Sequence, residues 1–219
     1  MQAKLMSSWP GTALDNLGLI RIVNADGRQA PFFWIFNAAD EPLKLGQAFE
    51  NDRPLIFTRS SHLLARKTES QQAVRKILAN YLVDALEPLV QNRGPGFRFG
   101  ANCQGCEPLI RIVNALHERG HGTDELVLIA CQLPPVNSKT RALLLYGDRD
   151  PANNPFAADR ARAEALADRM FPAYKRQTLI SAHGQYFEPR RVESLVRHLD
   201  QQRRVIDRLP FVALRRWLS

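Results

Sequence analysis

The feature that most constrains the fold of this chain is a regular alternation, from about residue 50 onward, of short apolar runs with longer helical segments. The apolar runs are continuous rather than interrupted by polar residues, which is typical of strands that are covered on both faces. We predict such strands at residues 54–57, 97–99, 126–130, 142–146 and 177–180.

The segments between these runs carry the signals of helices. Residues 70–90 place apolar side chains at i, i+3, i+4 and i+7, which indicates an amphipathic helix. Further helices are predicted at residues 43–49, 107–119, 157–170 and 191–205. Strands and helices that alternate in this way predict an α/β fold with a mostly parallel, doubly wound sheet built on right-handed crossovers.

The start of the chain differs from this pattern. Residues 17–23 and 32–36 are two mostly apolar runs on either side of the turn residues 24–27, which predicts an opening β-hairpin. Residues 1–16 are mixed in character, and we expect them to be a peripheral N-terminal segment. Residues 17–219 are then expected to form a single domain.

Composition narrows the class of protein. No apolar run reaches the roughly 20 residues that span a bilayer, and the first ten residues lack the apolar stretch of a signal peptide, so we expect a cytoplasmic protein without membrane insertion. The three cysteines do not suggest a disulfide framework. Cys103 and Cys106 form one C-x-x-C with no second pair or histidine cluster, so no metal site is predicted. Cys106 and Cys131 are interpreted as inert, buried residues.

The net charge of +8 raises the question of an acidic partner, such as nucleic acid, a membrane surface or an acidic carrier protein. The basic residues are spread along the chain, with some local density at Arg190–Arg191 and Arg203–Arg208. No basic motif interleaved with aromatic residues is present, so we do not expect a nucleic-acid partner. The alternative is a solvated, arginine-rich surface.

The segment with the most chemical information is residues 97–106, which predict a strand, a tight turn and a helix. Within it, residues 101–105 (Ala-Asn-Cys-Gln-Gly) have the form of the nucleophile elbow G-x-S-x-G, with Cys103 in place of serine. A helix N-terminus favours thiolate over thiol, so we expect a lowered pKa for Cys103. The same turn should point the backbone N–H of Gln104 toward a developing oxyanion. The alternative for Cys103 is an inert thiol at a helix start.

Asp150 and His183 each follow a predicted strand, and they complete a catalytic constellation. Nucleophile, acid and histidine is the chain order of the α/β-hydrolase triad, and open α/β sheets build their sites beyond the carboxyl ends of strands. Cys103 is therefore expected to attack an acyl carbonyl, His183 to take and return the proton, and Asp150 to orient the imidazole. Asp148 is an alternative acid, and the alternative for His183 is a solvated loop histidine.

A second oxyanion donor is expected from the loop that follows residues 32–36. This loop, residues 37–41, contains no glycine, and we nominate the backbone N–H of Ala38. The missing glycines also keep open a different class of function, a non-catalytic binding or scaffolding domain of the α/β-hydrolase type.

Residues 97–105 resemble the nucleophile elbow of thioesterase domains from polyketide and nonribosomal peptide assembly lines. Residues 108–120 and 125–129 are similar to the helix and strand that follow in that family, as are residues 31–36 and 79–86 upstream. The resemblance covers about residues 17–200 and implies an α/β-hydrolase fold. It also implies release of an acyl or peptidyl chain from a phosphopantetheine thioester on an acyl carrier or peptidyl carrier protein. Water or a small acyl acceptor would be the second substrate, with no cofactor or metal of the enzyme's own.

Three features depart from the usual pattern of that family. The nucleophile is cysteine, as in some members; the acid moves to Asp150, because residues 130–131 are Ala-Cys; and only residues 132–141 stand where a helical lid is usually inserted. We therefore expect an absent or minimal lid, and hydrolysis or transfer to a diffusible acceptor rather than macrocyclisation. The last two features also resemble dienelactone hydrolases, lidless enzymes with a Cys-Asp-His triad. A Cys-dependent ester or lactone hydrolase is thus the second hypothesis.

Overall fold

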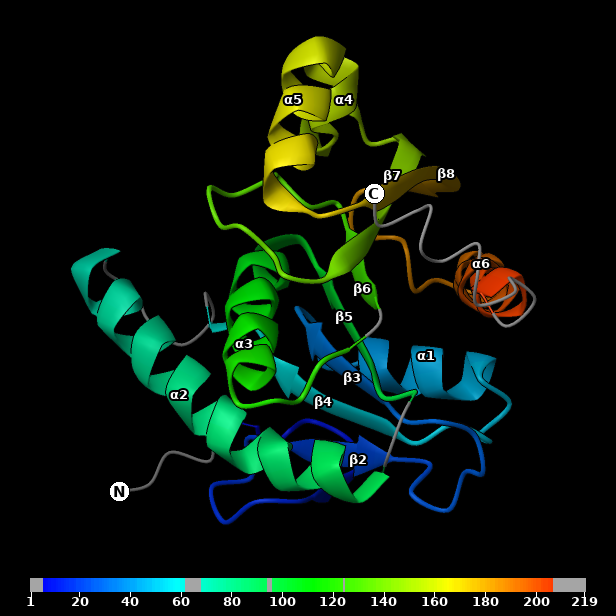
Figure 1. The fold of residues 1–219 in the computed structure, drawn as a ribbon. Helices are drawn as coiled ribbons and strands as arrows, with labels where there is room; N and C mark the ends of the chain where they lie inside the picture. Colours follow the sequence, from blue (N-terminus) through cyan, green and yellow to red (C-terminus); the bar gives the residue numbers. More distant parts are fainter. Residues whose placement is uncertain (1–5, 62–67, 94–95, 124, 207–219) are drawn as a thin grey trace.

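The computed structural model describes residues 6–61, 68–93, 96–123 and 125–206, and its centre is one sheet with helices on both faces (Figure 1). The eight strands lie in the order β1-β2-β4-β3-β5-β6-β7-β8. Neighbouring strands from β4 to β8 in this order are parallel, whereas β1 and β2 are antiparallel to their neighbours. The strands are β1 Thr12–Ala13, β2 Arg21–Val23, β3 Phe32–Phe36, β4 Leu55–Arg59, β5 Arg98–Asn102, β6 Glu125–Ile129, β7 Arg141–Arg149 and β8 Tyr174–Ala182.

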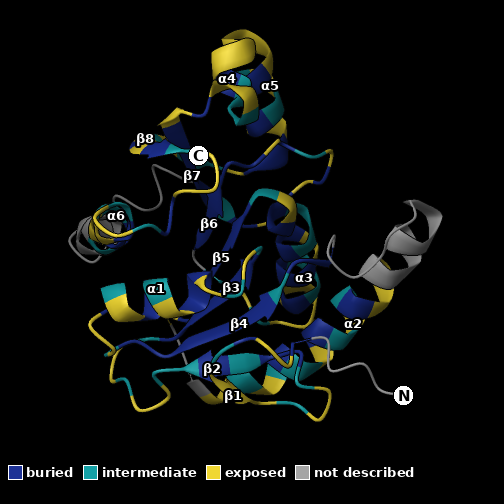
Figure 2. Cartoon of the chain, turned by 180° about the vertical axis from the view of Figure 1, so that it is seen from behind, coloured by how far each residue is buried: buried dark blue, intermediate teal, exposed yellow. Residues whose placement is uncertain are grey.

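Each face of the sheet has its own apolar core. Side chains of α1 and α6 pack in one core, and those of α2, α3, α4 and α5 pack in the other. In Figure 2 the buried residues run along the strands, while the outer sides of the helices are exposed. The helices are α1 Glu41–Ala48, α2 Thr68–Arg93, α3 Cys106–Glu118, α4 Pro155–Ala158, α5 Arg160–Met170 and α6 Arg191–Ile206.

The central strands confirm the prediction that was made from continuous apolar runs. Every residue of β3 and of β6 is buried, because helices cover both faces of these strands. The predicted mostly parallel, doubly wound α/β sheet is therefore what the chain forms.

The predicted opening β-hairpin is wrong. Strand β2 pairs with β4 in antiparallel register, Ile22 opposite Ile56, and not with β3. Strand β3 is parallel to β4 on one side and to β5 on the other, so neither edge of β3 is left for β2. The fully apolar sequence of β3 is better buried at the centre of the sheet than in a hairpin at its margin.

Two other segments differ from expectation. The helix predicted over 157–170 is two helices, because Asp159 ends α4 and its side chain accepts the backbone N–H of Arg162 at the start of α5. Within the segment expected to be peripheral, Met6 and Trp9 are buried and pack in the core that α1 and α6 cover. This part of the chain therefore contributes to the core.

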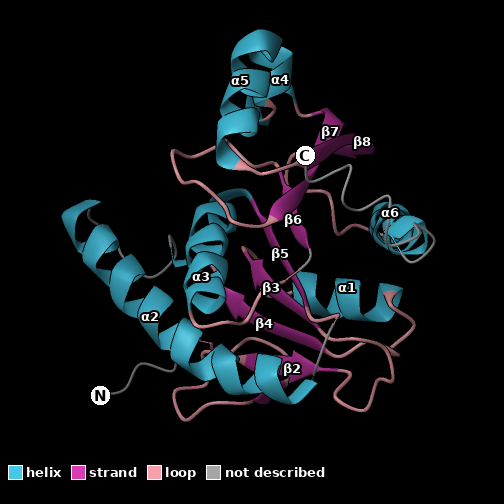
Figure 3. Ribbon diagram, viewed as in Figure 1, coloured by secondary structure: helices cyan, strands magenta, loops and turns pink. Residues whose placement is uncertain are grey.

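The connection between β6 and β7 is short and open. Residues 130–140 are all described and contain no helix, and Figure 3 draws this link as a loop. The expectation of an absent or minimal lid at this position is confirmed. None of the described helices is long and apolar enough to cross a membrane.

Candidate active site

Cys103 lies on a tight turn between β5 and α3. The preceding residue, Asn102, has an extended backbone, whereas Cys103 has φ +49°, in the left-handed region that L-residues adopt only under constraint. Two glycines allow residues of β3 to approach this turn closely: a Cβ on Gly100 would lie 2.3 Å from the ring of Trp34, and one on Gly105 would lie 3.0 Å from Ile35. The strand, strained turn and helix of a nucleophile elbow are therefore all present.

Parallel strands bring the three candidate triad residues to one edge of the sheet. Cys103, Asp150 and His183 directly follow the carboxyl ends of β5, β7 and β8. Cys103 Sγ lies 3.9 Å from His183 Nε2, and His183 Nδ1 lies 2.9 Å from Asp150 Oδ2. This arrangement corresponds to the tautomer in which Nδ1–H donates to the carboxylate and the lone pair on Nε2 faces the sulfur.

Asp150 is the carboxylate that contacts His183. It is only 4% exposed, and it accepts hydrogen bonds from Asn153 Nδ2 at 2.7 Å and from the Tyr186 hydroxyl at 2.9 Å. Burial works against ionisation of Asp150, but the hydrogen bonds from Asn153, His183 and Tyr186 outweigh it and hold the pKa of the carboxyl below its usual value. The alternative acid, Asp148, instead accepts the backbone N–H of Ser181 at 2.9 Å.

The expected low pKa of Cys103 is not found. Burial, followed by the negative charges of Glu41 and Asp150, raises the pKa of the Cys103 thiol to about 12. The positive end of the following helix does not compensate for these effects, because the thiolate would lie in a partly buried site beside two carboxylates. Cys103 is therefore expected to be a neutral thiol at pH 7.

The carboxylate of Glu41 lies in the loop of residues 37–41, which was predicted to supply the second oxyanion donor. Glu41 Oε2 accepts the backbone N–H of Asn37 at 2.9 Å and that of Ala38 at 3.0 Å. Its other oxygen accepts Asn102 Nδ2 at 3.3 Å, so the carboxylate also braces the residue before Cys103. Burial raises the pKa of Glu41, against the opposing effect of these hydrogen bonds. In this arrangement the N–H of Ala38 already has an acceptor.

Gln104 is the other predicted oxyanion donor. It lies in the first turn after Cys103, where backbone N–H groups have no acceptor within the helix. Its backbone is thus in the right position of the sequence for this role, which stays a prediction.

The other two cysteines are buried. Cys106 Sγ contacts the backbone oxygens of Ala101 and Ile129 at 3.6 Å, and burial raises the pKa of this thiol well above its usual value. Cys131 is fully buried and its backbone oxygen accepts the Tyr146 hydroxyl. Among the described residues, no group of three or more His, Cys, Asp or Glu side chains is arranged to hold a metal ion.

Sequence reasoning missed Glu41, Tyr186 and Asn153. Glu41 follows Asp40 and precedes Pro42, and that pattern indicates a helix start rather than a site. Tyr186 and Asn153 each lie three residues from a candidate triad residue, which is a spacing without a known signature. Only the fold brings them to Asp150.

Comparison with known proteins identifies the fold. Comparisons with protein-family models and with curated proteins find no match. Among solved structures, the chain is similar to the NocB thioesterase domain, with 13% identity and a TM-score of 0.63 over 84% of this chain and 98% of that one. The type II thioesterase YbtT, from the yersiniabactin NRPS/PKS pathway, has 14% identity and a TM-score of 0.57 over 84% and 98%. An esterase from the archaeon Pyrobaculum calidifontis has 12% identity and a TM-score of 0.52 over 84% and 79%. The chain has the α/β-hydrolase fold. In this fold, Cys103 lies on the turn after β5.

Proposed function

We propose that this α/β-hydrolase is a thioesterase that releases an acyl or peptidyl chain from a carrier-protein thioester through an acyl-enzyme on Cys103. One observation carries the proposal: Cys103 Sγ lies 3.9 Å from His183 Nε2, and His183 Nδ1 lies 2.9 Å from the carboxylate of Asp150. Cys103 itself lies on the strained turn after β5. A thiol 3.9 Å from an imidazole that is itself held by a carboxylate is the arrangement that nucleophilic catalysis requires.

In the acylation step, His183 Nε2 accepts the thiol proton while Cys103 Sγ bonds to the thioester carbonyl carbon. The carbon–sulfur bond to the pantetheine arm then breaks, and the imidazolium returns the proton to the departing sulfur. Because the pKa of Cys103 is about 12, proton removal and attack are coupled, and no free thiolate accumulates. The 3.9 Å separation is long for a hydrogen bond and is expected to shorten once a substrate is bound.

In the second step, His183 removes a proton from water or from an acceptor hydroxyl or amine, which attacks the acyl carbon. Cys103 leaves and takes the proton back from the imidazolium. Asp150 stabilises the imidazolium in both steps, and its ionised state is favoured by the hydrogen bonds that lower its pKa. The N–H of Gln104 is the proposed donor to the oxyanion, and Ala38 can join it only when Glu41 has moved away.

Three findings support a carrier-bound thioester as the substrate. The elbow sequence resembles that of assembly-line thioesterases, and two of the three solved structures compared above carry thioesterase names. The connection of residues 130–140 has no helix to close over the site, so a long pantetheine arm is not obstructed there. The same openness admits water or a diffusible acceptor, which favours hydrolysis or transfer over macrocyclisation.

Trapping of the acyl-enzyme tests this proposal. Purified protein is mixed with octanoyl-N-acetylcysteamine, quenched in acid and weighed by intact-mass spectrometry. We expect one octanoyl adduct, located on the peptide that contains Cys103. The adduct should be absent from Cys103→Ala and reduced by orders of magnitude in His183→Ala, while Cys106→Ala, a matched change at a buried cysteine, should retain it. Normal turnover by Cys103→Ala would reject the mechanism, and a protein that never forms an adduct would favour a non-catalytic binding domain.

A second candidate is a cysteine-dependent ester or lactone hydrolase. The position of Asp150 after β7 and the short link between β6 and β7 favour it, since both also resemble dienelactone hydrolases. A comparison of kcat/KM for an octanoyl thioester, p-nitrophenyl octanoate and a small unsaturated lactone separates the two. A preference for the lactone would replace the thioesterase proposal.

A further inference from the structure

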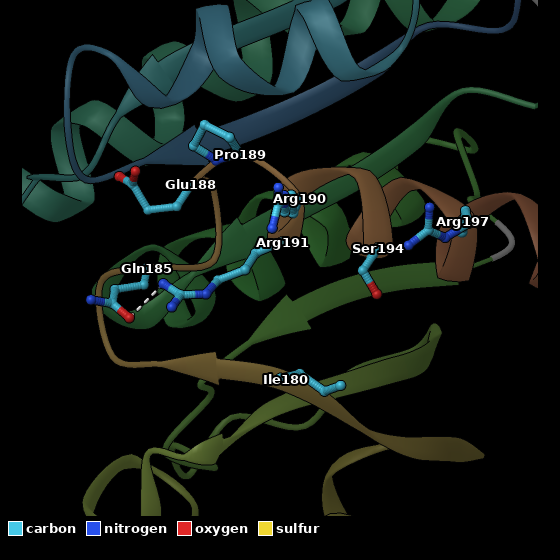
Figure 4. Close-up of a pocket in the computed structure, with 8 residues that line it drawn as sticks. All are labelled: Ile180, Gln185, Glu188, Pro189, Arg190, Arg191, Ser194 and Arg197. Carbon is cyan, nitrogen blue, oxygen red and sulfur yellow. Dashed lines mark hydrogen bonds between the residues drawn. The ribbon is translucent and has the colours of Figure 1, made fainter.

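A groove of about 680 Å³ lies between the edge strand β8 and the first turns of α6 (Figure 4). On the strand side the groove is lined by Ile180, a residue that is 75% exposed. The remaining lining residues come from the loop after β8 and from α6, and they are Gln185, Glu188, Pro189, Arg190, Arg191, Ser194 and Arg197.

The groove is positively charged. Its one carboxylate, Glu188, lies 2.8 Å from Lys44 Nζ, an ammonium that Glu188 shares with Asp40. Arg191 donates to the Gln185 side-chain oxygen, which leaves its charge in place. Arg190 and Arg197 are exposed, and neither makes an ion pair with another residue in the described part of the chain. Three guanidinium groups therefore line the groove against one carboxylate, and the charge of its lining is positive.

The groove and the candidate active site share one turn of the chain. Residues 183–191 connect β8 to α6, and their side chains point in two directions. His183 and Tyr186 contact Asp150, whereas Gln185 and Glu188 line the groove. A molecule seated in the groove would therefore contact the segment that carries His183.

We infer that this groove is the docking surface for the acidic face of the carrier protein that delivers the thioester. The inference rests on the proposed function and adds the location of the partner. Charge complementarity selects the occupant, because arginines at the rim of an interface attract an acidic surface and raise its rate of association. A second copy of this chain fits poorly, since a two-fold contact would place the same arginines against one another. The exposed Ile180 supplies an apolar contact within the charged rim.

The position of the groove also suits delivery. A carrier held beside the turn 183–191 presents its pantetheine arm at the edge of the sheet where Cys103 and His183 lie.

Charge reversal tests the inference. The double variant Arg190→Glu/Arg197→Glu is compared with wild type on three substrates: octanoyl loaded on a bacterial acyl carrier protein, octanoyl-coenzyme A and octanoyl-N-acetylcysteamine. We expect kcat/KM for the carrier substrate to fall about tenfold or more at low ionic strength, mainly through KM. The loss should shrink in 0.5 M salt, because exposed charges are screened. The N-acetylcysteamine substrate should change by less than about twofold.

The matched control is Arg162→Glu/Arg169→Glu, which makes the same charge change on two exposed arginines of α5. An equal loss in the control would show that net charge alone matters and would overturn the location. An equal loss with coenzyme A would assign the groove to phosphate groups instead of a protein face. An unchanged rate with the carrier would overturn the inference while leaving the thioesterase proposal intact, whereas absence of activity on all three substrates in wild type would reject the proposed function itself.

Discussion

Alkylation of Cys103 by iodoacetamide should keep accelerating with pH far beyond the range in which an ordinary cysteine levels off. Burial and the charges of Glu41 and Asp150 raise the pKa of this thiol from 9.0 to about 12. Three pH units correspond to about 4 kcal/mol against the thiolate. At pH 8 the thiolate fraction is then about one in ten thousand, against about one in ten for a thiol with the ordinary pKa.

The assay follows the rate of carbamidomethylation by mass spectrometry of the Cys103 peptide between pH 7 and pH 11, with circular dichroism to verify that the fold persists. We expect a tenfold increase per pH unit throughout, because only the thiolate reacts. The slope of the rate against pH distinguishes a raised pKa from poor access of the reagent to the thiol. Restricted access lowers the rate by the same factor at every pH and leaves the slope unchanged. A rate that reaches a plateau below pH 9 would refute the reasoning, because it would reveal a thiolate–imidazolium pair that forms spontaneously.

Three further outcomes follow from the geometry. Asp150→Asn should lower kcat by about four orders of magnitude. Asp148→Asn should remain within about tenfold, because Asp148 contacts the backbone N–H of Ser181 and the side chain of Arg149 and not His183. The reverse ranking, measured on one thioester, would reassign the acid. Tyr186→Phe removes one hydrogen bond that lowers the pKa of Asp150, so this carboxyl should titrate at higher pH in an NMR titration, and an unmoved titration would contradict this role. Gly100→Ala should lower the free energy of unfolding by about 3 kcal/mol in urea titrations, because the added Cβ would lie 2.3 Å from the buried ring of Trp34, and a stability equal to wild type would show that the elbow packs differently.

The sequence predicted the elements with a strong local signal. Strands β3 and β6 are continuous apolar runs, and helix α3 has the amphipathic spacing that its burial requires. The pairing of β2 was mispredicted because strand order depends on contacts between distant segments. The break at Asp159 was missed although Asp is a favoured N-cap, because the alanine-rich sequence on both sides suits one continuous helix.

The candidate site also has features that the sequence predicted and features that it did not. The chain order of Cys103, Asp150 and His183 was visible in the sequence, and the fold places the three side chains in contact. The pKa of the thiol was not predictable, because it depends on burial and on Glu41, which is 62 residues away along the chain. A local pattern can indicate a helix N-terminus, but the other charges that surround it are set by the tertiary structure.

The Glu41 side chain occupies backbone N–H groups of residues 37 and 38 that could otherwise bind another anion. Because its carboxylate is tethered three residues from Ala38, it is present there at a high effective concentration, and any other anion must displace it. The apparent affinity of such an anion is reduced by the fraction of time for which Glu41 holds the position. A free carboxylic acid, the product of the proposed thioester hydrolysis, has few other contacts that would help it to displace Glu41. A substrate anchored elsewhere by its carrier has more, so the arrangement favours release of the product and weak inhibition by it.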